Sequence, residues 1–477
     1  MLISATSVGQ SIDDCFPAKV RRWFGIVIAI FDVFLFGGYH YGFNSLVEVY
    51  KSVGLYAYNC TQEGCLYHEN MFGVVFIVWM VSQMCLIVLA GVLLDKVGLR
   101  ITKILATILF SAGTLMFAFT TASTVPLFYA AGILVALASI CSLICNHQVS
   151  SMFPHIRGLC ISLISGAYDS STVIAFIISL TYKTFPFKWS FIILAIFAVF
   201  VGIFVALFIL TRYSRDMGKY AASSKKEEVD FSENSLTGGD VPKLDIYGEI
   251  SALLDERFPS LKSCVFSMPY LLINIWFTLG LFRFSFYLTH FVKHITAMFI
   301  TDATLKVHLL TVSSAFFLCG FLVAPITGTI IDYFLRRARN KIEHMLILKK
   351  DSYYPNKIYY TLVGGLVPAL SLMAVFAVLL SIMMFIPQYI ACYAAFIFLV
   401  IVRSLLFSTF ISFLLSAFPV RYFGTLNGIS NALAGIISLL QYAFLETSTL
   451  VDNIVTLLIS TGIFFIPIVF LILSKKK

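Results

Sequence analysis

The chain has 477 residues, of which 60% are hydrophobic and only 12% are charged, and its formal net charge is +9. Soluble domains are about half apolar and about a quarter charged, so this composition excludes an ordinary soluble globular protein. Lipid must be the solvent for much of the chain.

Twelve mainly apolar stretches follow one another, each close to the roughly 20 residues that a helix needs to cross the hydrocarbon core. They lie near residues 24–44, 71–94, 102–121, 126–147, 158–181, 189–211, 267–291, 307–331, 358–386, 389–416, 424–444 and 452–473. The sequence therefore predicts an all-α membrane protein with twelve transmembrane helices.

Basic residues predict the orientation of these spans. Lys19, Arg21 and Arg22 precede the first span, and Lys475–Lys477 end the chain. Because cytoplasmic loops are enriched in Lys and Arg, we expect both termini in the cytoplasm. Most of the 33 Lys and Arg residues then lie in cytoplasmic loops, and Lys103 is counted among them. The outer loops hold only Lys51, Lys183, Lys188, Lys293 and Lys306. The positive charge is a topology signal, and no nucleic-acid partner is expected.

The first predicted outer loop contains two cysteines, Cys60 and Cys65. An outward-facing pair meets oxidising surroundings, in which disulfides form and persist. A loop disulfide and two free thiols are both compatible with the sequence. The other cysteines lie mostly inside spans, where Cys acts as a small apolar packing residue.

One long polar stretch, residues 212–264, separates the sixth span from the seventh. Its composition is typical of a flexible linker. The predicted domains are a cytoplasmic N-terminal segment at 1–23, a six-helix bundle at 24–211, the cytoplasmic linker at 212–264, a second six-helix bundle at 265–473 and a cytoplasmic tail at 474–477.

The two halves repeat two patterns at equivalent places. Gly91 is followed after three residues by Asp95 and then by basic residues, and Gly328 is followed in the same way by Asp332. The run from Phe153-Pro154 to Arg157 and Gly158 is matched by the run from Phe418-Pro419 to Arg421 and Gly424. Two ordered matches predict two related bundles with a pseudo-twofold axis along the membrane normal.

The segment Gly91–Arg100 has a physical interpretation as a cytoplasmic latch. Gly91 and Gly98 permit close backbone approach and a tight turn. Asp95 ends one helix, where its carboxylate can accept charge-assisted hydrogen bonds from a helix N-terminus or an arginine. We expect this latch to consist of Gly91, Asp95, Gly98, Arg100 and Asp332. The alternative is an ordinary charge pair in a helix–loop–helix turn.

The run Gly-x-Leu-x-Asp-Lys-x-Gly-x-Arg at 91–100 resembles the signature loop of the major facilitator superfamily. The corresponding run of the second half, from Gly328 to Arg337, matches it less fully. This resemblance implies two pseudo-symmetric six-helix bundles and a central cavity lined by the first, fourth, seventh and tenth spans. It also implies transport by alternating access.

Within that superfamily, several segments resemble solute carrier family 43. They are residues 42–46, 51–60, 95–100, 166–171, 283–287, 401–403 and 423–428. That family contains facilitative large neutral amino acid transporters and an equilibrative nucleobase transporter, and the plasma-membrane amino acid transporters of apicomplexan parasites are its relatives. Residues 42–60 and 283–287 resemble the amino acid branch more closely, and residues 166–171 the nucleobase branch.

Four ionisable residues lie well inside predicted spans: Asp32, Asp169, Arg283 and Arg403. A charge at mid-membrane costs about 2.5–3.5 kcal/mol on insertion scales, so such groups should face a wet cavity or one another. One interpretation is structural ion pairs between helices. The other is contact with substrate, in which an arginine fork binds a carboxylate and Asp32 binds an ammonium or a guanidinium.

Two polar residues complete the predicted substrate site, Asn44 and Tyr287, toward the outer ends of the first and seventh spans. The sequence as a whole predicts a facilitative, uniport-type plasma-membrane transporter of amino acids, neutral or cationic, that works by alternating access. The alternatives are a nucleobase transporter of the same fold and a transporter-like receptor or scaffold that moves nothing.

The expected partners are a small-molecule solute and the lipid bilayer, with a single chain as the transport unit. The sequence contains no P-loop and no Cys/His spacing typical of a metal site. We therefore expect no enzyme activity, no cofactor and no metal.

Overall fold

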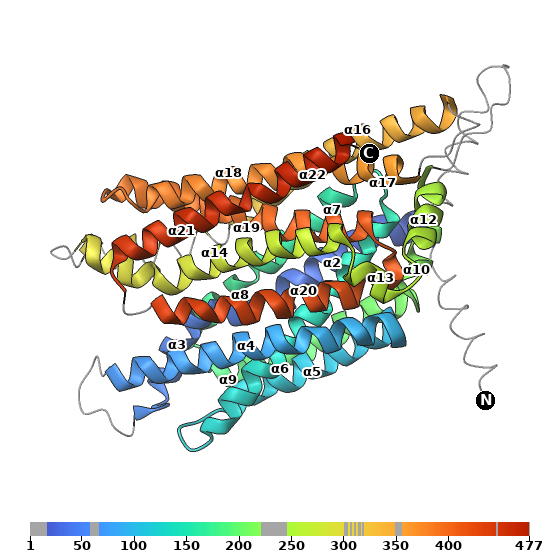
Figure 1. Ribbon diagram of the computed structural model, residues 1–477. Helices are drawn as coiled ribbons and strands as arrows, with labels where there is room; N and C mark the ends of the chain where they lie inside the picture. The colour runs from blue at the N-terminus through green and yellow to red at the C-terminus, as the bar shows by residue number, and fades with distance from the viewer. Residues whose placement is uncertain are drawn as a thin grey trace. The chain divides into compact units, whose positions relative to one another are not determined.

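The computed structural model describes residues 17–57, 66–220, 246–299, 304–305, 308–309, 312, 316, 319–348, 355–444 and 447–476. All regular elements within these ranges are helices (Figure 1). The chain divides into two compact units. Unit 1 comprises Met1–Met152 and Gly166–Ala222, and unit 2 comprises Phe153–Ser165 and Ser223–Lys477.

Unit 1 is built from long apolar helices joined by short turns. Its elements are α2 (Ala18–Phe36), η1 (Tyr39–Gly42), α3 (Phe43–Ser52), α4 (Leu66–Val97), α5 (Leu99–Phe119), α6 (Val125–His147), η3 (Gln148–Met152), the second half of α7 (Arg157–Ser170), α8 (Thr172–Thr181), α9 (Phe187–Phe204), the π-helical turn η4 (Val205–Ile209) and α10 (Ser214–Met217).

Unit 2 begins with the first half of α7 and continues after the polar stretch. Its elements are α12 (Ile246–Arg257), α13 (Leu261–Val265), α14 (Met268–Met298), α16 (Gly320–Leu348), α17 (Pro355–Gly364), α18 (Val367–Met383), α19 (Tyr389–Ala417), η6 (Val420–Tyr422), α20 (Phe423–Ser438), η7 (Leu439–Phe444), α21 (Thr449–Ile463) and α22 (Phe465–Lys476). Helix α21 packs against α14 and against α18 (Figure 1).

Several helices begin at a proline. Pro126, Pro269 and Pro368 occupy the first turns of α6, α14 and α18. A first-turn N–H has no partner inside the helix, so proline loses nothing there, and its fixed φ favours the start. These residues help to set where the spans begin.

Ten helical segments of the described chain are long and apolar enough to cross a membrane. The first predicted span differs, because Gly37 and Gly38 interrupt it between α2 and η1. The eighth predicted span, 307–331, falls partly outside the described residues. The all-α membrane fold is thus confirmed, whereas twelve spans, cytoplasmic termini and the predicted domain limits stay predictions.

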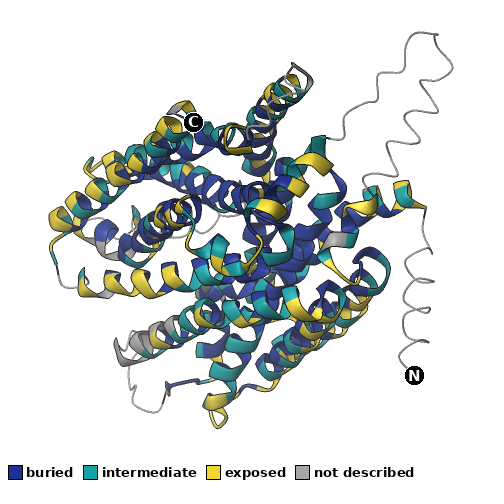
Figure 2. Ribbon diagram, turned by 45° about the vertical axis from the view of Figure 1, so that its right-hand side comes forward, coloured by how far each residue is buried: buried dark blue, intermediate teal, exposed yellow. Residues whose placement is uncertain are grey.

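The outward faces of the spans are apolar, although they are exposed (Figure 2). Phe200 of α9 is 70% exposed, and Leu458 of α21 is 66% exposed. Water would penalise such surfaces, and large exposed apolar areas mark contact with a membrane or a partner. Lipid is the natural neighbour of these faces.

Candidate functional site

Two helices of unit 1 are broken where they meet. The first predicted span unwinds between α2 and η1, and the fifth is interrupted at Ser171, between α7 and α8. The Gly38 N–H donates to the Ser171 hydroxyl. A Cβ on Gly38 would stand 2.8 Å from the Tyr168 carbonyl oxygen, so a larger residue there would separate the two breaks. Discontinuous helices in transporters typically line solute sites.

A polar and aromatic cluster surrounds these breaks. Gln83, a buried residue of α4, is at its centre. The Gln83 Nε2 donates to the Tyr168 hydroxyl at 3.3 Å, the Tyr41 hydroxyl donates to Gln83 Oε1 at 3.4 Å, and the His40 Nε2 lies 3.3 Å from the same oxygen. The His40 and Tyr41 rings are 4.5 Å apart, and the Tyr41 and Tyr168 rings 5.8 Å. We call Gln83, His40, Tyr41 and Tyr168 the glutamine cluster.

The glutamine cluster offers chemistry that suits a flat, nitrogen-rich solute. A glutamine amide presents an acceptor and two donors side by side, and a purine or pyrimidine edge carries matching groups. Aromatic rings stack on the faces of bases. Gln83 is now hydrogen-bonded to two hydroxyls and lies beside an imidazole. The polar groups of a bound solute can take the place of these partners.

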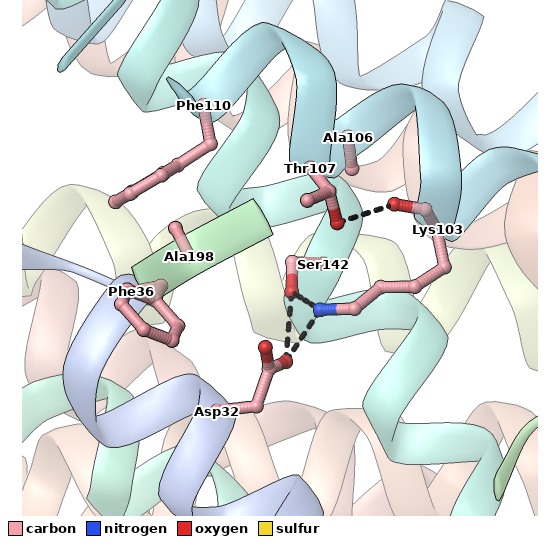
Figure 3. Close-up of a pocket in the computed structure, with 8 residues that line it drawn as sticks. All are labelled: Asp32, Phe36, Lys103, Ala106, Thr107, Phe110, Ser142 and Ala198. Atoms are coloured by element: carbon pink, nitrogen blue, oxygen red, sulfur yellow. Dashed lines mark hydrogen bonds and ion pairs between the residues drawn. The ribbon is translucent and has the colours of Figure 1, made fainter. Parts of the chain in front are cut away.

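Asp32 lies on α2 beside Lys103 of α5 and Ser142 of α6 (Figure 3). Lys103 forms an ion pair with the Asp32 carboxylate, Asn146 donates to Asp32 Oδ2 at 2.6 Å, and Ser142 donates to it at 3.3 Å. Lys103 and Asp32 are 2% and 1% exposed. The neighbouring cavity measures about 10 Å³, about the space of one water molecule. Asp32 is therefore held by its own unit.

Lys103 also corrects the count of basic residues. It was counted among the charges of the cytoplasmic loops, but its ammonium is buried in unit 1. It is the second residue of the predicted span 102–121, so its charge belongs to that span and not to a loop. Its partner Asp32 supplies the charge that makes this burial tolerable.

Arg283 and Tyr287 lie one turn apart on α14, inside unit 2. The Arg283 Nε donates to the Ser381 hydroxyl of α18 at 3.0 Å, and the guanidinium carbon is 5.9 Å from the Tyr287 ring centre. Arg283 is 1% exposed, and its Nη2 has no hydrogen-bond partner within the described part of the chain. This nitrogen is a buried donor that a bound group or a water would satisfy.

The remaining predicted substrate residues are located as follows. Arg403 of α19 is buried in unit 2, with its guanidinium carbon 5.2 Å from the Phe284 ring centre. Asp169 is buried in unit 1, near the end of α7. Asn44 lies in α3, but its side chain is outside the described residues, as are Cys60 and Cys65. The structure thus brings Arg283 and Tyr287 together and pairs Asp32 with a lysine that was not predicted.

Asp332 of α16 caps the N-terminus of α7, within unit 2. Its two carboxylate oxygens accept hydrogen bonds from the backbone N–H groups of Gly158 and Leu159, both at 2.7 Å. A Cβ on Gly328 would stand 2.4 Å from the Leu159 Cα, so only glycine permits this crossing. Arg339 adds a bond of 2.9 Å to the Pro154 carbonyl. These contacts explain why residues 153–165 pack with unit 2.

The segment Gly91–Arg100 supports a second set of contacts, in unit 1. Gly98 has φ +108°, a conformation that strongly favours glycine, and a Cβ there would lie 2.5 Å from the Arg212 carbonyl oxygen. Arg100 donates to the carbonyls of Ala206, Leu207 and Leu210 at 3.0, 3.4 and 2.9 Å. A cation at the C-terminal end of α9 and η4 satisfies carbonyls that the helix leaves open.

Asp95 and Gly91 belong to the last turns of α4. Gly91 is buried and Asp95 is half-buried. Their predicted part in a latch stays a prediction. The contacts of Arg100 show that the basic end of this segment binds carbonyls of the sixth predicted span.

A family model described as Major Facilitator Superfamily matches residues 22–441 of this chain. The chain belongs to the major facilitator superfamily. The resemblance based on residues 91–100 is thereby confirmed, and with it the transporter class of the protein and its multi-pass membrane setting.

Relatives and solved structures agree with this membership of the major facilitator superfamily. Equilibrative nucleobase transporter 1 of Bos taurus is 24% identical over 451 residues, which is 87% of this chain and 88% of that protein. This similarity agrees with the predicted resemblance to solute carrier family 43.

Two solved structures are similar in fold. The proton:xylose symporter XylE bound to 6-bromo-6-deoxy-D-glucose has a TM-score of 0.59 and 13% identity, with 96% of this chain and 95% of that chain covered. A bacterial homologue of the iron transporter ferroportin, in its outward-facing state, has a TM-score of 0.55 and 12% identity, with 96% and 100% covered. At these identities the likeness shows the fold alone.

Sequence reasoning missed several residues that the structure groups together. Gln83, His40 and Tyr41 were not singled out, because uncharged polar residues inside a span give a weaker signal than charges do. His290, His294 and Asp452 were missed because they lie at the ends of predicted spans, where polar residues are common. Clustering in space, rather than residue type, distinguishes them.

Proposed function

We propose that this protein is an equilibrative transporter of nucleobases, working as a uniporter by alternating access in the plasma membrane. The glutamine cluster is the observation that carries the proposal, because it combines an amide with stacking rings at broken helices. The similarity to a protein named as an equilibrative nucleobase transporter supports the same substrate class.

The buried charges are compatible with an uncharged solute. Asp32, the predicted acceptor for a substrate ammonium, already has Lys103, Asn146 and Ser142 as partners. A nucleobase needs no charged partner, so Asp32 and Lys103 can stay paired throughout transport. An amino acid would have to recruit its ammonium acceptor elsewhere or break this pair.

Uptake by cells that express the chain tests the proposal. We expect saturable uptake of radiolabelled adenine or uracil and no uptake of leucine or lysine. Gln83→Ala should lower nucleobase uptake at least several-fold at equal surface expression. Gln388→Ala is the matched control, because Gln388 is exposed and its side chain makes no capping bond at the start of α19.

Two results would contradict the nucleobase proposal. One is uptake of amino acids without uptake of nucleobases. The other is equal nucleobase uptake by wild type and Gln83→Ala. No uptake of either class, despite surface expression, would favour the receptor or scaffold alternative.

Amino acid transport is the second candidate, and Arg283 is the observation that favours it. A buried guanidinium nitrogen without a partner is suited to one oxygen of a carboxylate. If Arg283 binds a substrate carboxylate, Arg283→Lys should impair leucine or lysine uptake, because lysine keeps the charge and loses the fork. Unchanged amino acid uptake by Arg283→Lys would count against this role.

A further inference from the structure

A small cavity lies inside unit 2, beside the C-terminal half of α14. It measures about 20 Å³, enough for a water molecule. Its lining comes from three helices or their ends: Arg283, Phe286, Tyr287, His290 and His294 of α14, Met384 after α18, and Asp452, Asn453 and Thr456 of α21. The charge distribution of the sequence predicts that this end of unit 2 faces the outside.

His290 is held so that its two ring nitrogens face different acceptors. Its Nε2 lies 3.2 Å from the Gln441 carbonyl oxygen, and its Nδ1 lies 3.5 Å from Asp452 Oδ2. A carbonyl can only accept, so Nε2 must carry a hydrogen. In a neutral ring the Nδ1 is then an acceptor, and it faces a carboxylate oxygen. Two acceptors in contact repel, and a single proton between them turns the contact into a bond.

The surroundings of His290 favour the protonated ring. The Phe286 ring stacks on it with 4.0 Å between centres and 10° between planes. The face of an aromatic ring attracts a cation. Asp452 lies in the first turn of α21, where the helix dipole stabilises a carboxylate, and its Oδ1 accepts from the Thr447 hydroxyl. An imidazolium–carboxylate pair therefore satisfies both residues.

Among the described residues, the titratable groups that line the cavity or lie close to it are the following. Arg283, Tyr287 and His294 share α14 with His290, and Cys392 of α19 lies near Tyr287. In their described portions, α18, α20 and η7 carry no charged residue. Burial lowers the pKa of His294, and the Met384 backbone and Asp452 oppose that shift. His294 thus tends to stay neutral, which leaves His290 as the ring best placed to hold a proton beside Asp452.

We propose that His290 and Asp452 form a proton-binding site at the outer end of unit 2, through which external pH sets the transport rate. A proton from the outer solution joins His290 Nδ1 and bridges α14 to α21; it returns to the same side when the pair opens. The bridge ties α14 to its neighbours, so acid slows any movement of α14. The proton modulates transport and does not cross with the solute.

The melting temperature of the purified full-length protein, measured in detergent from pH 5.5 to pH 8.0, tests the site without any substrate. A proton held by the folded pair stabilises the fold in acid, and this contribution is lost as the pH rises. The wild type should therefore melt several degrees above His290→Gln at pH 5.5, and this gap should shrink toward pH 8.0. A gap that does not change with pH would overturn the proposal.

Asp452→Asn gives a second and sharper test. Its Oδ1 can still accept from Thr447, and its Nδ2 can donate to a neutral His290 Nδ1, so the bridge forms without a proton. This variant should keep its stability from pH 5.5 to pH 8.0, and its transport should be slow at every pH. If Asp452→Asn retained the pH dependence of the wild type, the pair would not be the proton site.

His308→Gln is the matched control. His308 is an exposed histidine of unit 2 that lies 2.9 Å from the Tyr393 hydroxyl. Its removal should leave the pH profiles of stability and uptake unchanged. A profile that changed with His308 and not with His290 would assign the pH response to a surface group and overturn the proposal. Because melting needs no solute, this result is independent of whether nucleobases are the substrate.

Discussion

The Asp332 carboxylate accepts a hydrogen bond of 2.7 Å from the backbone N–H of Gly158. The same carboxylate caps Leu159, whose Cα lies 2.4 Å from the place that a Cβ on Gly328 would take. The carboxylate of Asp332 and the absent side chain of Gly328, four residues apart on α16, thus stabilise the same crossing of α16 and α7. Two different substitutions can test these two contributions separately.

Asp332→Asn should loosen the start of α7. The amide offers one acceptor in place of two charged oxygens, so one backbone N–H is left without a partner and the other loses its charged acceptor. Hydrogen bonds to charged groups contribute about 1.5–3 kcal/mol each, so a loss of about 1–3 kcal/mol in stability is expected. Thermal unfolding of the purified protein measures it. Asp216→Asn, at an exposed ion pair with Lys219, should change nothing measurable.

Gly328→Ala tests the steric half of the same crossing. A Cβ 2.4 Å from the Leu159 Cα cannot be accommodated unless α7 moves, and overpacking typically costs about 1–3 kcal/mol. Gly462→Ala is the control, because a Cβ there meets nothing within 4 Å. Alanine favours a helix over glycine by about 1 kcal/mol, so Gly462→Ala should be neutral or stabilising. Equal effects of the two substitutions on the melting temperature would refute the close crossing.

The Asp32–Lys103 pair predicts strong coupling between two substitutions. Either Asp32→Asn or Lys103→Met leaves one buried charge without its partner, which costs about 3–5 kcal/mol. The double variant removes both charges and should be more stable than at least one of the single variants. Melting temperatures of the four proteins measure this coupling. Additive effects would mean that the two side chains do not depend on each other.

Arg100→Ala should destabilise the end of unit 1 at which α5 begins and η4 ends. Three carbonyls at the end of the sixth predicted span lose their donor, and we expect a loss of about 1–3 kcal/mol. Arg100→Lys should recover only part of it, because an ammonium lacks the planar fork. Arg336→Ala, which removes an exposed arginine, serves as the control for loss of charge alone. If the melting temperature of Arg336→Ala were as low as that of Arg100→Ala, the loss of the carbonyl contacts would not be the cause of the destabilisation.

Sequence patterns predicted the elements that repeat or that carry a rare residue type. The pattern of Gly328 and Asp332 was found because it repeats Gly91 and Asp95 at the equivalent place of the other half, and the structure shows the contacts that Gly328 and Asp332 make. The left-handed turn at Gly98 followed from the same reasoning, because only glycine adopts that conformation without strain.

Such patterns do not predict contacts between helices that are distant in the sequence. The partner of Asp32 is Lys103, 71 residues away in the sequence. Nothing in the local sequence of α2 or α5 pairs them, so the sequence left open the choice between an ion pair and contact with substrate. The glutamine cluster was not predicted for the same reason, since Gln83 and Tyr168 are 85 residues apart.

The time course of adenine uptake into proteoliposomes holding the purified protein tests the central claim most directly. An equilibrative nucleobase transporter predicts that adenine inside the vesicles rises to the outside concentration and stops there. An imposed proton gradient should change the rate and leave that final level unchanged. Accumulation above the outside concentration under a proton gradient, or uptake no faster than in protein-free vesicles, would contradict the account.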